Sequence, residues 1–145
     1  MPDELAVSSS AACYAPPAMD GSRAGMYFAN TYRAQERDRY ASEAVAFHEA
    51  VPGRHFQLTL ALELTELPLL RRLPIFEAYA EGWGLYAERL ADEMGLYSSP
   101  LDRLGMLALD SLRAARLAVD TGLHAKGWSR QQAVDLMLAN TPGRR

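Results

Sequence analysis

The chain has 145 residues, 49% of them hydrophobic, and a formal net charge of −3 at neutral pH. This length suits a single domain with its own core, and the charge gives no sign of a nucleic-acid partner. The single cysteine, Cys13, excludes an internal disulfide framework and a metal site made of cysteines. With no leader pattern and no apolar run that could span a bilayer, the sequence predicts a cytoplasmic protein without a membrane partner.

The N-terminal part of the sequence has little helical character. Residues 1–13 have no hydrophobic periodicity, and we expect them to be mobile. The aromatic-rich segment 26–32 is the one strand that the sequence predicts. A strand beside a site could hold a substrate backbone by strand addition, with Tyr27 and Asn30 as substrate contacts. The alternative is an extended segment that packs its aromatic rings on the helices.

Apolar residues three and four positions apart predict helices over most of the remaining chain. The expected helices cover residues 36–51, 54–66, 69–73, 75–94, a long segment that starts at Ser99-Pro100, and 129–138. Ser129 and Gln132 form a capping box, and Gly95 is well placed to end the fourth helix. We therefore expect a mainly α fold, a bundle of about five to six helices with one short strand near the N-terminus. Residues 14–141 form its single domain, and 142–145 are a tail.

The sequence FHEAVPGRHFQ contains the residues with the clearest chemistry. A His-Glu pair on a helix, followed by another histidine, is how zinc peptidases hold their metal and their general base, which points to His48 and Glu49. The usual second histidine comes four residues after the first, but here that residue is Pro52. The next histidine, His55, lies roughly 10 Å further along an ideal helix. A kink or bulge at Pro52-Gly53 could bring it back toward His48.

Three acids follow on one predicted helix. Glu77, Glu81 and Glu88 are separated by four and seven residues, so they lie near one helix face. Gly82 and Gly84 each weaken a helix by roughly 1 kcal/mol relative to alanine. Their presence in this helix suggests that another element approaches its backbone closely.

The long helix carries a further set of polar residues. Arg113 and Arg116 are expected to bind carboxylates, either structural ones such as the glutamates or those of a peptide. Asp120 and His124 are four residues apart on one face, a suitable arrangement for an acid that orients an imidazole. The alternative is a pair that only holds the end of the helix in place.

Four blocks of the sequence, in the same order, resemble the domain-of-unknown-function 885 family, a group similar to the zinc-dependent gluzincin peptidases. The block with His48 resembles the family motif H-E-A-x-P-G-H-x-x-Q. The other blocks lie in residues 16–32, 81–88 and 119–129. The resemblance implies a zincin-like metal-site core and hydrolysis of a peptide or a similar amide.

The resemblance also implies roles for individual residues. Zinc would be held by His48, a second histidine and Glu81, with Glu77 and Glu88 as alternatives to Glu81 or as solvated acids. Glu49 would act as the general base, and His124 would contact the substrate or stabilise the transition state. The remaining expected site residues are Gln57, Glu77, Glu88 and Asp120, which would support the ligands, and Tyr27, Asn30, Tyr86 and Arg116, which would contact a peptide or small amide substrate.

One residue departs from the family motif at a critical position. Arg54 stands where the family has its second histidine, and a permanently charged guanidinium cannot be a zinc ligand. Either His55 takes over as a ligand, or zinc binding is weakened or lost. The sequence therefore predicts either a zinc-dependent hydrolase or a metal-free, catalytically inactive peptide-binding module or truncated fragment.

The size of the chain affects the expected assembly. Family members are generally several times longer, so this sequence resembles the metal-bearing middle of a larger enzyme. Uncovered apolar helix faces tend to drive association. We therefore expect a homo-oligomer that covers them.

Overall fold

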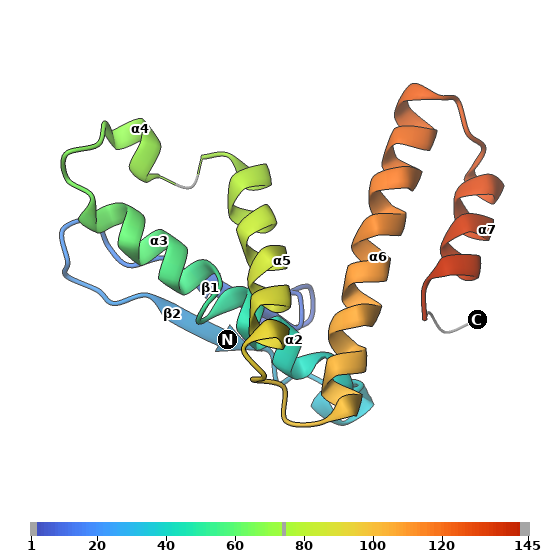
Figure 1. Ribbon diagram of the computed structural model, residues 1–145, viewed down its shortest axis with the longest axis horizontal. Coiled ribbons are helices and arrows are strands. Elements are labelled where there is room, and N and C mark those ends of the chain that lie inside the picture. The colour runs from blue at the N-terminus through green and yellow to red at the C-terminus, as the bar shows by residue number, and fades with distance from the viewer. Residues whose placement is uncertain (1–2, 74, 143–145) are drawn as a thin grey trace.

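The computed structural model describes residues 3–73 and 75–142 and is mainly helical, with one small antiparallel sheet (Figure 1). Five helices in this part of the chain have eight or more residues, in agreement with the expected bundle. In chain order the elements are α1 (Asp3–Ala6), β1 (Ala12–Ala15), β2 (Met26–Ala29), the 3-10 turns η1 (Ala34–Glu36) and η2 (Arg39–Ala41), α2 (Ser42–Glu49), α3 (Arg54–Glu63), α4 (Leu69–Arg72), α5 (Glu77–Glu93), α6 (Pro100–Ala125) and α7 (Arg130–Asn140).

Helix α2 lies at the centre of the arrangement. It contacts β1 on one side and α3, α5 and α6 on the others. Helices α6 and α7 form an antiparallel pair that stands apart from the hairpin and α3 (Figure 1). The residues at the end of α2 are therefore surrounded by elements from most of the chain.

The predicted helix ends are confirmed where a capping residue indicates them. The Ser99 side chain accepts a hydrogen bond from the backbone of Asp102 at the start of α6, and Ser129 and Gln132 form the expected capping box. Gly95 follows α5 with φ +69, a conformation that favours glycine. Helix α2 ends at Glu49 and α3 begins at Arg54, so Pro52-Gly53 lies in the break between them.

The N-terminal region differs from the sequence prediction. A second strand, β1, pairs antiparallel with β2, with Ala12 opposite Ala29. The segment expected to be mobile contains α1 and the start of β1. The Asn30 side chain explains part of this order, because its amide donates to the carbonyls of Ala6, Ser9 and Ser10. The segment is therefore held by Asn30, which lies 20 or more residues further along the chain. A contact over that distance cannot be predicted from the sequence of the segment itself.

The segment predicted as one helix over residues 36–51 is divided into η1, η2 and α2. Asp38 has an extended conformation, with ψ 126, which interrupts helical hydrogen bonding. The carbonyl of Tyr40 lies where a side chain on Gly105 of α6 would be. Contact with α6 therefore sets the path of this segment, and its own apolar periodicity does not.

The buried residues are mostly small, and many large apolar residues are exposed. The exposed surface is 9783 Å², whereas a compact monomer of 16.0 kDa exposes roughly 7,400 Å². Several large apolar residues are more than half exposed. They include Leu101, Leu104 and Leu117 on α6 and Phe76 and Tyr79 at the start of α5. Self-association over these faces stays a prediction. Within the described ranges, no helix has the length and apolar character needed to cross a membrane.

Candidate functional site

The centre of the site is the His48 side chain, which is only 3% exposed. Its ring lies between two glutamates of α5, one at each nitrogen. Nδ1 is 2.7 Å from Glu88 Oε1, and Nε2 is 3.2 Å from Glu81 Oε2. The spacing of seven residues places both acids on one helix face, as the sequence predicts.

Glu88 is fully buried and joins three helices. Arg113 of α6 approaches both of its oxygens, with Nη2 2.9 Å from Oε1 and Nη1 3.2 Å from Oε2. The Oε1 atom also lies against the His48 ring of α2. A carboxylate without solvent contact is stable only when such partners replace its lost hydration. Of the two alternatives predicted for Arg113, binding to a structural glutamate is therefore the one that the structure shows.

The absence of a side chain at Gly84 allows the His48 ring to pack against α5. A Cβ atom on Gly84 would overlap the imidazole, and the nearest atom would be Nε2. Nothing lies within 4 Å of the position that a Cβ on Gly82 would take. The predicted close approach to this helix is thus found at one of the two glycines.

Alanine substitution at the two glycines is expected to have opposite effects. Gly84→Ala forces the His48 ring away from Glu81 and should lower the free energy of unfolding by roughly 1–3 kcal/mol, as overpacking does. Gly82→Ala is the matched control and should raise it by about 1 kcal/mol through helix propensity. Urea unfolding of both variants measures the difference. An equal gain in stability at both positions would contradict this packing of His48.

Arg54, the first residue of α3, bridges two acids of the site. Its Nη1 atom is 2.8 Å from Glu81 Oε1 and 3.8 Å from Glu49 Oε2. These are the acids expected to be the third zinc ligand and the general base. The guanidinium group therefore contacts both the expected third zinc ligand and the expected general base.

Glu49, at the end of α2, is a largely buried acid. Its Oε2 atom has no hydrogen-bond partner among the described residues. Burial raises the pKa of the Glu49 carboxyl, although the charge of Arg54, that of His48 and a bond from the Tyr14 backbone each lower it.

His55 points to a different neighbour. Its Nδ1 atom is 2.8 Å from the Tyr14 hydroxyl, and the two rings meet edge to face at 5.4 Å between centroids. In residues 3–73 and 75–142, no three His, Cys, Asp or Glu side chains are grouped so that they could hold a metal ion. The break at Pro52-Gly53 therefore does not bring His55 into one ligand set with His48 and Glu81.

The other expected supporting residues lie at varied distances from the site. Gln57 is buried and donates to the Tyr79 carbonyl on α5 at 3.2 Å, so it links α3 to α5. Glu77 is exposed at the start of α5. His124 and Asp120 lie near the C-terminal end of α6, 3.6 Å apart at Nε2 and Oδ1, with side chains 77% and 76% exposed.

The expected substrate contacts also separate into groups. Tyr86 and Arg116 are exposed, and neither lines the cleft beside His48. Asn30 is only 5% exposed, and its side-chain amide donates hydrogen bonds to backbone carbonyls. Tyr27 is 42% exposed and lines a separate pocket, and burial and the Glu49 carboxylate raise its pKa.

A cleft of about 360 Å³ opens beside the cluster. Residues 10–13, in and before β1, line one side of it, while the other side contains His48, Glu49, Arg54, Glu81 and Arg113. Sequence reasoning missed residues 10–13, because a four-residue strand without alternation gives no signal. It expected Arg113 to bind a carboxylate, but that this carboxylate is Glu88 beside His48 depends on how α6 crosses α2 and α5.

The edge of β1 that faces away from β2 is unpaired within the described sheet. The Asn30 backbone N–H donates to the Ala11 carbonyl at 2.9 Å, so Ala11 faces β2. Antiparallel pairing alternates, and Ala12 and Tyr14 therefore direct their backbone groups outward. The Ser10 hydroxyl donates to the Ala12 carbonyl at 2.6 Å.

The comparisons with known proteins find a bacterial family and a similar solved structure. A family model described as "Bacterial protein of unknown function (DUF885)" matches residues 1–145. A solved structure, described as that of "the putative lipoprotein from Colwellia psychrerythraea", is 41% identical, with a TM-score of 0.90. The alignment covers 99% of this chain and 25% of that one, so this chain spans about a quarter of that relative. No curated protein matches.

Proposed function

The chain belongs to the bacterial DUF885 family, and from this membership and the geometry of the cleft we propose a metal-free member that binds peptides without hydrolysing them. The observation that carries the proposal is the position of Arg54. Its guanidinium lies 2.8 Å from Glu81 and 3.8 Å from Glu49, where the resemblance implies a zinc site.

The residues present do not fit a zinc ion. Catalytic zinc sites in proteins use three protein ligands, whereas His48 and Glu81 supply two here. Arg54 cannot lose its proton, so it would repel a divalent cation next to Glu81. The ion pair of Arg54 with Glu81 also offsets the negative charge that would attract a metal ion.

Peptide binding is supported by the walls of the cleft. One wall is formed by residues 10–13, in and before β1, whose edge away from β2 pairs with no strand of the described sheet, so an extended peptide can lie along it. The opposite wall contains both guanidinium and carboxylate groups, which match the carbonyls and amides of a peptide. A few convergent polar groups in a concave site are typical of ligand pockets.

Protein purified without chelators is expected to bind a fluorescently labelled pool of random hexapeptides without cleaving it. Anisotropy gives an apparent dissociation constant, and mass spectrometry of the same pool reports cleavage. Ala11→Trp should weaken binding by at least about tenfold, or 1.4 kcal/mol, because Ala11 is exposed and lines the cleft. Ala139→Trp, on the exposed side of α7, is the matched control.

Two outcomes would overturn the proposal. Absence of peptide binding at any concentration tested would remove the binding function. Cleavage of the pool by the wild-type protein would remove the claim of inactivity.

A second candidate, a zinc-dependent hydrolase of peptide or amide bonds, is favoured by one observation. His48 Nε2 and Glu81 Oε2 are 3.2 Å apart, and Glu49 follows His48 in the chain, so most of the expected catalytic set remains. This candidate requires Arg54 to leave Glu81. About one zinc per wild-type chain, found by elemental analysis, would favour it over the metal-free proposal.

A further inference from the structure

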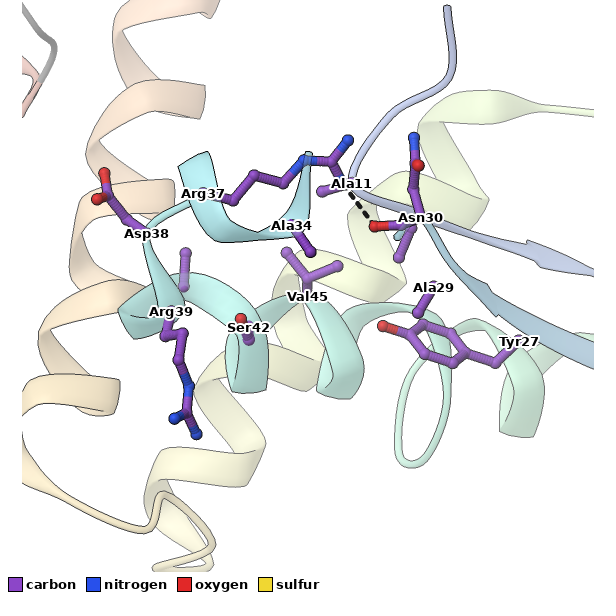
Figure 2. A pocket seen from close by; sticks show the side chains of 12 residues that line it. Ala11, Tyr27, Ala29, Asn30, Ala34, Arg37, Asp38, Arg39, Ser42 and Val45 are labelled. Carbon is purple, nitrogen blue, oxygen red and sulfur yellow. Dashed lines mark hydrogen bonds between the residues drawn. The ribbon is translucent and has the colours of Figure 1, made fainter. Parts of the chain in front are cut away.

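A second pocket, of about 380 Å³, lies between the hairpin and the start of α2 (Figure 2). In Figure 2, Val45, Ala34 and Ala29 lie around its middle, and Tyr27 directs its hydroxyl inward from β2. Arg37 extends across the opposite side and donates to the Asn30 carbonyl at 2.8 Å.

Many of the side chains that line this pocket are small. Five of its lining residues are alanines: Ala11, Ala12, Ala29, Ala34 and Ala41. A hollow bounded by methyl groups, where larger side chains would otherwise meet, has space for an apolar group from a ligand.

The pocket shares part of its lining with the cleft beside His48. Ala11, Ala12 and Val45 line both of them. A peptide that follows β1 in the cleft would therefore run beside residues that also line the pocket.

We propose that this alanine-lined pocket is a specificity subsite that takes one aliphatic or aromatic side chain of the peptide bound beside β1. The inference rests on the proposed peptide binding. An apolar side chain fits because methyl groups surround the middle of the pocket. The Arg37 guanidinium is already bonded to the Asn30 carbonyl, and Figure 2 shows Asp38 and Arg39 directed away from the middle.

Position-scanning hexapeptide pools test the subsite. Each pool has one position fixed as glycine, leucine or phenylalanine, and anisotropy measures its binding to the full chain. At one position the wild-type protein should bind the leucine or phenylalanine pool roughly tenfold to a hundredfold more tightly than the glycine pool, the range expected for burial of such a side chain.

Filling the pocket should remove this preference. In Ala34→Leu the leucine-to-glycine ratio at that position is expected to fall to within about threefold, while the glycine pool keeps its wild-type affinity. Ala29→Leu fills the same pocket from β2 and should act alike, so the test does not depend on the folding of one variant. Ala139→Leu on α7 is the control and should leave the ratio unchanged.

The outcomes separate this inference from the proposed function. Peptides that bind with the same affinity for glycine and leucine at every position would overturn the subsite and leave peptide binding intact. A preference that survives both filling variants would also overturn it. If no pool binds the wild-type protein, the proposed function itself fails.

Discussion

Arg54→His is expected to change a chain without bound zinc into one that binds about one zinc ion. The substitution removes the guanidinium from its position 2.8 Å from Glu81 and places an imidazole at the start of α3, opposite His48. Three protein ligands then become available, the number typical of catalytic zinc sites. The affinity for zinc should rise by more than about 100-fold, because even changes to groups outside the ligand set alter it by 10- to 100-fold.

Arg54→Gln provides the control for this experiment. It removes the positive charge and leaves a polar side chain, but it adds no imidazole. If the charge alone prevented binding, Arg54→Gln would also gain zinc. We expect it to remain without zinc, with elemental analysis and calorimetric titration as the measurements. A full zinc complement in the wild-type protein, or no zinc in Arg54→His, would contradict the role assigned to Arg54.

Helix periodicity predicts that Glu81 and Glu88 lie on one face of α5. It does not predict which residues of other elements contact them. Glu81 and Glu88 were placed on one face of a helix by their spacing alone, and the structure puts both against His48. That Arg113 completes the buried cluster depends on how α6 crosses α2 and α5. Such a crossing is a tertiary property, and the apolar pattern of α6 only shows that one face is buried.

The position of His55 could not be predicted from the local sequence. The sequence offers a flexible joint at Pro52-Gly53, and a joint permits several directions for the residues after it. The Tyr14 hydroxyl, 2.8 Å from His55 Nδ1, takes part in fixing one of them. Tyr14 belongs to a strand that exists because of its partner β2, so neither the strand nor this hydrogen bond could be predicted from the local sequence.

Removal of Arg113 is expected to destabilise the fold more than removal of Glu88. Arg113→Met leaves the fully buried Glu88 carboxylate without its cation and should lower the free energy of unfolding by about 3–5 kcal/mol. Glu88→Met leaves the Arg113 side chain, which is 29% exposed and can regain contact with water. Its cost should therefore be smaller, about 1–3 kcal/mol.

The double variant Glu88→Met/Arg113→Met separates pairing from packing. Replacement of both partners by apolar residues removes the buried charge together with its cation, and such replacements are often close to neutral. We therefore expect the double variant to be more stable than Arg113→Met alone, with the deficit reduced by about 2 kcal/mol or more, the size of coupling found for residues in contact. Urea unfolding of the four proteins measures the coupling. Additive losses would mean that Glu88 and Arg113 stabilise the fold independently, and the buried cluster would then not depend on their ion pair.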